Sequence, residues 1–152
     1  MQEEFKLQEV AVSGPLNNLV TASYLHNGHE AYLEVAQGSG LQLVPAHLRD
    51  PYKTSSKGVG QLIRHAFYEN NVRKIFIGCG GSAFVDGGIG ALSEVGIDVF
   101  DAQGQLVNTA RDNYVRGDSI FRASQLRVRD ERILKELELT VLTDVRNPLF
   151  GE

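Results

Sequence analysis

The sequence of 152 residues predicts an α/β protein in which helices flank a mixed β-sheet. Apolar side chains between residues 59 and 67 recur at the three- and four-residue spacing of a helix. Residues 72–77 form a β-branched apolar run that is typical of a central, parallel strand. Because this length suits one ordinary core, residues 1–152 are expected to form a single α/β domain.

Antiparallel strands are expected at the amino-terminal end, in residues 1–12, 19–25 and 30–35. The first stretch alternates loosely between apolar and polar side chains and ends at Ser13-Gly14-Pro15. Asn27-Gly28 separates the other two stretches and is a hairpin signal, because both residues tolerate the positive φ angles of a tight turn. The three stretches are therefore expected to be antiparallel neighbours.

The middle and the end of the chain alternate helices with strands. The hydroxyl run Thr54-Ser55-Ser56 precedes the first helix, and one of its side chains is expected to cap that helix. Together with two following glycines, these hydroxyls could also hold an anion. Further along, the pattern predicts a helix over 89–95, a strand over 97–100 and a hairpin from that strand into 105–107. A polar surface loop is expected over 108–125, and a solvated helix face over 122–132. The pattern then predicts a helix over 129–137 and a strand over 139–142.

Composition and charge limit the kinds of partner. The net charge of −4 argues against a general nucleic-acid surface. No apolar run approaches the roughly 18 residues of a membrane span, and no signal peptide opens the chain. The single cysteine, Cys79, excludes an internal disulfide and indicates a reducing compartment. We therefore expect a cytoplasmic protein without nucleic-acid or membrane partners.

A glycine-dense loop follows the apolar run and leads into the helix at residue 89. Strand, glycine loop and helix start form the geometry in which backbone N–H groups converge on an anion. Residues 78–83 also match G-x-G-x-x-A, and Asp98 and Asp101 lie about 20 residues on, as in a dinucleotide site. Against a nicotinamide cofactor, the strand that ends at Asp101 is expected to enter a hairpin. Cys79 in this loop is interpreted as a small buried filler, with a reactive thiol as the alternative.

Two carboxylates follow apolar strands. Asp86 precedes two glycines at a helix start, where it could be an N-cap, a Mg²⁺ ligand or a proton acceptor. Asp144 follows the last strand. If that strand is parallel to residues 72–77, both acids lie at the carboxyl edge of the sheet, where α/β proteins bind ligands. Together with Ser82, this arrangement would suit phosphoryl transfer.

Four motifs in the same order resemble those of the bacterial-type glycerate kinases. Residues 78–88, Gly-Cys-Gly-Gly-Ser-Ala-Phe-Val-Asp-Gly-Gly, resemble the family signature G-I-G-G-S-A-T-N-D-G-G. Residues 34–41 are similar to E-M-A-x-A-S-G-L, residues 54–63 to T-T-T-Y-G-T-G-E-L-I, and residues 144–151 to D-V-x-N-P-L-x-G. The resemblance covers roughly residues 10–151.

The resemblance implies ATP-dependent phosphorylation of D-glycerate to a phosphoglycerate, with ATP and Mg²⁺ as cofactors. It also implies a chain that forms the central portion of a fold with two α/β domains, one inserted in the other. In this interpretation Asp86 and Asp144 are catalytic, and Asp86 also holds Mg²⁺. The residues that bind substrate or phosphate are Gly80, Gly81, Ser82, Gly87 and Asn147.

Two alternatives stay open beside this reading. Phe84 and Val85 replace Thr-Asn of the signature, and the family segments D-S-F-K, A-D-G-G-E-G and G-P-Q-K-G-A are missing. These departures favour a non-catalytic anion-binding or interaction module, a remnant of the enzyme. The G-x-G-x-x-A match keeps an NAD-dependent enzyme as the other alternative. A sheet that normally continues into missing segments would expose strand edges, so self-association through those edges is expected.

Overall fold

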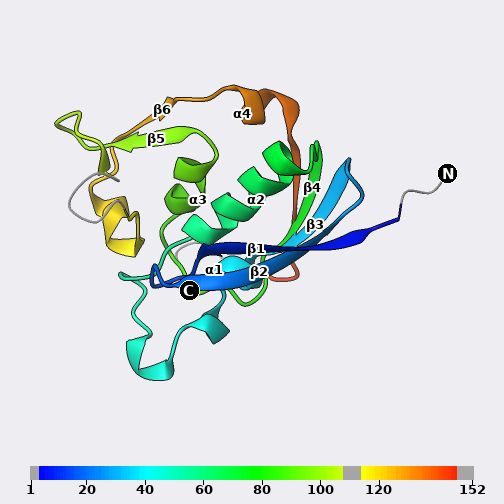
Figure 1. Ribbon diagram of the computed structural model, residues 1–152. Helices are drawn as coiled ribbons and strands as arrows, with labels where there is room; N and C mark the ends of the chain where they lie inside the picture. The colour runs from blue at the N-terminus through cyan, green and yellow to red at the C-terminus, as the bar shows by residue number, and fades with distance from the viewer. Residues whose placement is uncertain (1–3, 108–113, 147–152) are drawn as a thin grey trace.

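The computed structural model describes residues 4–107 and 114–146. Its main sheet has five strands in the order β1-β2-β3-β4-β7 (Figure 1). These strands are β1 (Lys6–Ser13), β2 (Leu19–His26), β3 (Glu30–Glu34), β4 (Lys74–Gly78) and β7 (Glu138–Leu142). The mixed α/β architecture that the sequence predicts is therefore confirmed.

The register divides the sheet into an antiparallel and a parallel half. Strands β1, β2 and β3 pair antiparallel, and the Asn27 side chain closes the predicted hairpin by accepting hydrogen bonds from the backbone N–H groups of His29 and Glu30. Strands β3, β4 and β7 pair parallel, with Gly78 opposite both Glu34 and Leu142. The expected central, parallel strand is thus confirmed, and three carboxyl ends meet at one edge of the sheet.

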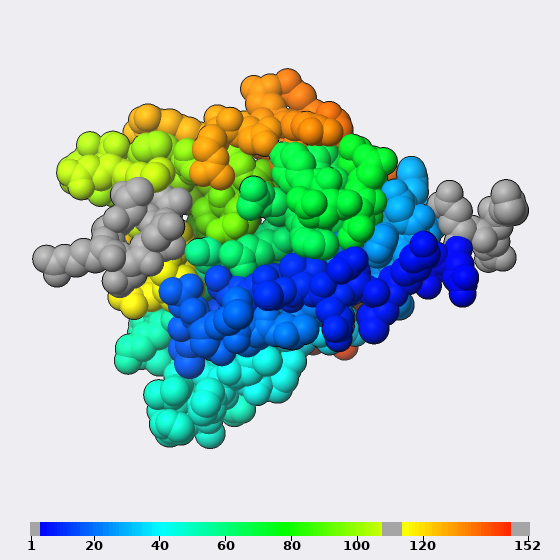
Figure 2. Space-filling view, viewed as in Figure 1, coloured from blue at the N-terminus to red at the C-terminus, as the bar shows by residue number. Residues whose placement is uncertain are grey.

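Helix α2 (Lys57–Glu69) covers one face of this sheet. Its apolar stripe is buried at the predicted spacing, by Val59, Leu62, Ile63, Ala66 and Phe67. This stripe shares one core with alternate residues of the first four strands, among them Val12, Ala22, Ala31, Leu33, Ile75 and Ile77. The space-filling view shows α2, in green, between the blue β1–β2 pair and the orange segment that contains β6 and α4 (Figure 2).

A second, smaller layer lies beside α2. Helix α3 (Ile89–Glu94) packs on α2 and leads into β5 (Ile97–Phe100), which pairs with β6 (Gln125–Val128) in a separate sheet. The 3-10 helix η4 (Gly117–Phe121) precedes β6, and α4 (Arg132–Glu136) connects β6 to β7. Short helices α1 (Val35–Ser39), η1 (Leu41–Leu43) and η2 (Ala46–Leu48) fill the segment between β3 and α2. No helix in the described part of the chain is long and apolar enough to cross a membrane.

Of the expectations for this layer, the hairpin into residues 105–107 is confirmed in a short form, and the helix is wrong. Asp101 N–H donates to the Gln105 carbonyl at 2.9 Å, and Leu106 forms an antiparallel bridge to Phe100, whereas the strand that pairs with β5 over its whole length is β6. Strand β6 lies within the stretch expected to be a solvated helix face, and only Arg132–Glu136 of the expected helix 129–137 is helical. The four residues of β6, Gln-Leu-Arg-Val, are all exposed. They show no buried face that would distinguish a surface helix from a surface strand, and backbone pairing with β5 decides between them.

Candidate active site

The carboxyl ends of β3, β4 and β7 bring together segments that are far apart in the sequence. Glu34, Gly78 and Leu142 lie side by side in the register. The Cys79 N–H continues the pairing beyond β4 by donating to the Leu142 carbonyl at 3.1 Å. The loop after β4 therefore begins between the end of β3 and the segment of Asp144, at the edge where α/β sheets bind ligands.

Backbone hydrogen bonds join the loop after β4 to the end of α1 and the residues that follow it. The Gly81 carbonyl accepts from Leu41 N–H at 2.8 Å, and Ala83 N–H donates to the Ser39 carbonyl at 2.9 Å. Gly80, Gly81 and Ser82 are exposed, and within the described residues their three N–H groups have no hydrogen-bond partner. Three successive free donors at one edge are suited to an anion. Cys79 is also exposed here, so its interpretation as a buried filler is wrong.

Asp86, in contrast, is fully buried. One carboxylate oxygen, Oδ2, accepts from the Ser56 N–H and hydroxyl, both at 2.8 Å, and from Gly90 N–H at 3.3 Å. The other oxygen accepts from Gly88 N–H at 3.0 Å. The carboxylate thus occupies the starts of both α2 and α3, where it meets the partial positive charge of their N–H groups. The anion at the start of α2 is a side chain of the protein itself.

The hydroxyl run before α2 ties this centre together. Ser55 Oγ accepts from Lys57 N–H at 3.1 Å, so a hydroxyl of the run does bond to the first turn of α2. Ser56 Oγ instead donates to Asp86 and accepts from Ala91 N–H of α3 at 2.9 Å. Thr54 Oγ1 donates to the Ala83 carbonyl at 2.7 Å. The start of α2 is thereby fastened to both ends of the segment that runs from the glycine loop into α3.

The other predicted site residues lie in different places. Asp144 is exposed two residues beyond β7, at the same edge as the glycine loop. Gly87 has a φ angle of +64° and lies near Ile120 of η4, whose Cδ1 would be 2.9 Å from an added Cβ. Asn147 lies outside the described residues. The structure therefore gathers Gly80, Gly81, Ser82 and Asp144 at the edge and keeps Asp86 in the interior.

The side chains available as ligands limit where a metal ion could bind. In residues 4–107 and 114–146, no group of three or more His, Cys, Asp or Glu side chains is placed to hold one. Both oxygens of Asp86 already accept hydrogen bonds from the protein, whereas the exposed Asp144 carboxylate has room for an ion. Mg²⁺ usually takes one or two protein carboxylates and completes its shell with phosphate oxygens and water. Asp144 fits that role better than Asp86 in this geometry, and the assignment of Mg²⁺ to Asp86 stays a prediction.

A family model described as the glycerate kinase family matches residues 1–152. The chain belongs to this family. Glycerate 2-kinase of Escherichia coli strain K12 is 39% identical over 145 residues, which are 93% of this chain and 36% of that protein. Glycerate kinase of Halalkalibacterium halodurans is also 39% identical over 145 residues, 94% of this chain and 37% of that protein.

A solved structure of the same family matches the fold. A crystal structure assigned as glycerate kinase 2 from Salmonella typhimurium LT2 superimposes with a TM-score of 0.83 at 38% identity. The match covers 95% of this chain and 38% of that chain. This chain therefore spans less than two fifths of the length of the glycerate kinases that it matches.

The nicotinamide alternative lacks its structural context. In a dinucleotide fold, the strand that carries the ribose-binding acid lies parallel to the strand before the glycine loop. Here β5, with Asp98 on it and Asp101 after it, pairs antiparallel with β6 in a separate sheet. The topology that follows the glycine loop therefore differs from that of a dinucleotide fold.

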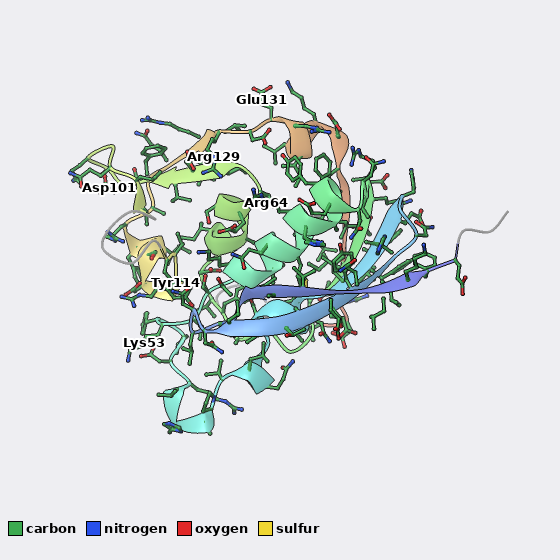
Figure 3. The ribbon with its side chains drawn as sticks, viewed as in Figure 1. Lys53, Arg64, Asp101, Tyr114, Arg129 and Glu131 are labelled. Carbon is green, nitrogen blue, oxygen red and sulfur yellow. The ribbon has the colours of Figure 1, made fainter. Side chains whose placement is uncertain are left out.

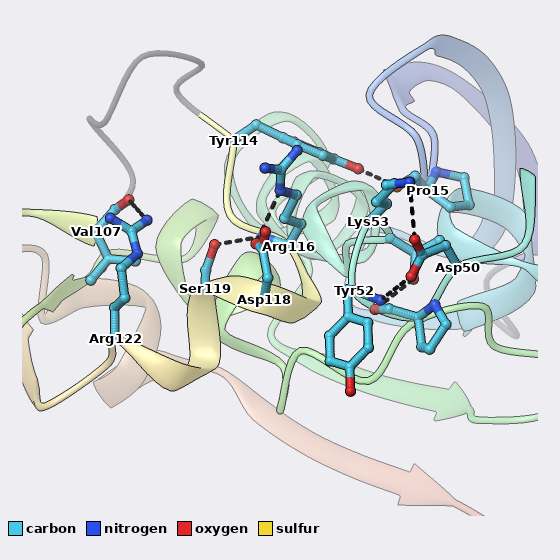
Figure 4. Close-up of polar contacts among 12 residues, drawn as sticks. Pro15, Asp50, Tyr52, Lys53, Val107, Tyr114, Arg116, Asp118, Ser119 and Arg122 are labelled. Atoms are coloured by element: carbon cyan, nitrogen blue, oxygen red, sulfur yellow. Dashed lines mark hydrogen bonds and ion pairs between the residues drawn. The ribbon is translucent and has the colours of Figure 1, made fainter.

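Two polar groups of this glycerate kinase family member, Ser39 and Tyr114, were not predicted as site residues from the sequence. Ser39 Oγ is the buried side-chain oxygen that lacks a partner among the described residues, and its backbone carbonyl anchors Ala83. Tyr114 lies in the stretch expected to be a surface loop, yet it points to the β1–β2 turn, where its hydroxyl donates to the Pro15 carbonyl (Figures 3 and 4). Burial, together with the negative charge of Asp86, raises the pKa of Tyr114 to about 12.

The raised pKa of Tyr114 predicts that the folded chain loses stability at alkaline pH. The pKa of a tyrosine is about 10 in an unfolded chain, so between pH 10 and pH 12 the unfolded state loses the proton first. We expect the free energy of unfolding to fall with rising pH across that window. Tyr114→Phe should remove this contribution to the decline and lower stability at pH 7 by about 1 kcal/mol, through loss of one hydrogen bond. Urea unfolding of both proteins between pH 7 and pH 12 measures this, and parallel curves would contradict the assignment.

Proposed function

We propose that this chain contributes part of a phosphotransferase site that phosphorylates D-glycerate with ATP and Mg²⁺. The observation that carries the proposal is a row of three N–H groups, on Gly80, Gly81 and Ser82, at the carboxyl edge of a glycerate kinase family chain; none of the three has a hydrogen-bond partner among the described residues. The names of its relatives support the substrate, and the remaining length of those relatives is needed for a complete site.

The loop is well suited to an anionic group. Glycerate carries a carboxylate and ATP carries phosphates, and each can accept several N–H donors at once. The Ser82 hydroxyl adds a fourth donor beside them. With the anion fixed, the glycerate hydroxyl oxygen forms a bond to the γ-phosphorus while the bond from that phosphorus to the ADP oxygen breaks, and the hydroxyl proton passes to a carboxylate. Mg²⁺, when bound, neutralises charge on the phosphates.

The carboxylates divide these tasks in our proposal. Asp144, exposed at the edge, accepts the proton or holds Mg²⁺. Asn147, which lies outside the described residues, is assigned to the site from its sequence motif alone. Asp86 orients the loop and the starts of α2 and α3 from the interior, because its oxygens are occupied by donors of the protein. The catalytic role predicted for Asp86 from the sequence is tested against this positioning role in the Discussion.

Substitution in the loop should weaken binding without unfolding the chain. An added Cβ at Gly80 meets no heavy atom within 4 Å, and the φ angle there is not in the left-handed region, so Gly80→Ala should fold normally. The methyl group would still crowd the free N–H groups, and Ser82→Ala would remove the hydroxyl. We expect each variant to weaken D-glycerate binding at least about tenfold in calorimetric titration, equivalent to about 1.4 kcal/mol.

The matched control for these loop variants is Gln103→Ala, an exposed side chain beyond β5. Its affinity for D-glycerate should equal that of the unmodified chain. Loop variants that bind as well as the control would remove the loop from the site. The second candidate is an anion-binding module, which the short span of the chain relative to its relatives supports. Binding that responds to the loop, with no product from ATP even when the rest of E. coli glycerate 2-kinase is joined to this chain, would favour it.

We further propose a cytoplasmic location and weak self-association through strand edges. Strands β1 and β7 are the two edges of the main sheet, and free edges can pair with another chain. Mass that rises with concentration in light scattering would agree with self-association. A constant monomer mass up to high concentration would contradict it.

A further inference from the structure

An apolar groove of about 400 Å³ runs between α2 and α3 on one side and α4 and β7 on the other. Val59 and Ile63 of α2, Leu92 of α3, Leu134 of α4 and Leu139 and Val141 of β7 are among its walls. Among the described residues, no charged side chain lines it. A water-filled groove with such walls loses the free energy that burial of apolar surface would provide.

The floor of the groove is a strand that lacks the cover given to its neighbour. Leu139 and Val141 of β7 lie opposite Ile75 and Ile77 of β4 and point to the same face of the sheet. Both isoleucines are buried in the core cluster to which α2 contributes, but Leu139 is 47% exposed and Val141 is 55% exposed. Parallel strands normally have both faces covered by helices. On this face of the sheet, β7 is therefore the strand that α2 leaves uncovered.

The spacing of strands and helices indicates that one further helix fits over β7. Packed helices lie about 8–10 Å apart, and neighbouring strands lie about 4.8 Å apart, so one helix covers roughly two strands. A helix placed beside α2 on this face would lie over β4 and β7, along the floor of the groove. Because no charge lines the groove, the side of that helix facing β7 must be apolar, whereas its outer side faces water.

The length of the relatives identifies the source of such a helix. The chain matches only 38% of the Salmonella glycerate kinase 2 chain, although the shared part superimposes with a TM-score of 0.83. We propose that the groove is the docking surface for an amphipathic helix from the remaining part of the glycerate kinase fold. This inference rests on family membership and apolar packing. It is independent of the phosphoryl-transfer proposal, because its test measures stability and mass rather than turnover.

The test compares the same substitutions in two contexts. Leu139→Asp and Val141→Asp are made in the 152-residue chain and in a chimera, where this chain replaces the matched segment of E. coli glycerate 2-kinase. In the chain alone both side chains are half exposed, so the melting temperature should change by less than about 3 °C. In the chimera the aspartate would be buried against the docked helix, and the melting temperature should fall by at least about 5 °C. Leu19→Asp, at a 78% exposed position on β2, is the control in the chain alone.

Three outcomes would overturn the proposal. A chimera that does not fold shows that the groove and the remaining part of the fold are not complementary. A folded chimera that tolerates both aspartates as well as the chain alone shows that the groove faces solvent in that context. A chain that is dimeric alone, and that Val141→Asp makes monomeric, assigns the groove to a second copy instead.

Discussion

Asp86→Ala is expected to lower the free energy of unfolding by about 3 kcal/mol or more. The substitution removes the acceptor for the N–H groups of Ser56, Gly88 and Gly90 and for the Ser56 hydroxyl. Each buried donor left without an acceptor costs about 1–3 kcal/mol. Because Asp86 is fully buried, solvent water does not reach these donors to replace the lost carboxylate. Urea unfolding, followed by far-UV circular dichroism, measures the change.

Asp86→Asn separates the positioning role from the catalytic one. The amide offers one acceptor oxygen in place of two, so its NH₂ group must face either the donors of Ser56 and Gly90 or the N–H of Gly88. We expect a clear loss of stability together with any loss of activity. Asp144→Asn is the matched control, because that side chain is exposed and its loss should leave the melting temperature unchanged. Full stability of Asp86→Asn with lost activity would restore the catalytic assignment.

Gly58→Ala has the second largest expected effect. An alanine is ordinarily a better helix former than glycine by about 1 kcal/mol. At this position, however, the added Cβ would lie 2.2 Å from the Ser13 carbonyl oxygen and 2.6 Å from the Gly38 carbonyl oxygen. Because both contacts are to backbone, α2 would have to move away from β1 and α1, which we expect to lower the free energy of unfolding by about 1–3 kcal/mol.

The comparison variant for Gly58→Ala is Gly80→Ala, where the added Cβ meets no atom. Chemical unfolding of the two variants and the unmodified chain measures the difference. A Gly58→Ala protein as stable as the unmodified chain would mean that α2 can shift without loss, contrary to the close packing of its first turn.

Much of the fold could be predicted because its signals are local. The spacing of Val59, Leu62 and Phe67 indicates a helix by itself, and Asn27-Gly28 indicates a hairpin by itself. The β-branched run before Gly78 was sufficient to predict a central, parallel strand. Once β4 and β7 were taken as parallel, the meeting of the glycine loop and Asp144 at one edge followed from sheet geometry.

The burial of the Asp86 carboxylate could not be predicted in the same way. An aspartate followed by two glycines at a helix start suits an exposed catalytic acid and an internal cap equally well. What distinguishes them is Ser56, which precedes Asp86 by 30 residues and meets it only after α2 and α3 have packed together. Strand β6 escaped prediction for a related reason, since its partner strand β5 lies about 25 residues away and its own four side chains are all exposed.

Glycerate-dependent ADP release by the chimera is the most direct test of the proposed site. The chimera of this chain with the remainder of E. coli glycerate 2-kinase is supplied with D-glycerate, ATP and Mg²⁺, and ADP is measured by a coupled assay. We expect release that requires glycerate and that falls at least about tenfold in Ser82→Ala and in Asp144→Asn, at unchanged melting temperature. A folded chimera that releases no ADP, or one whose rate is unaffected by both substitutions, would contradict the assignment of the carboxyl edge as the phosphotransferase site.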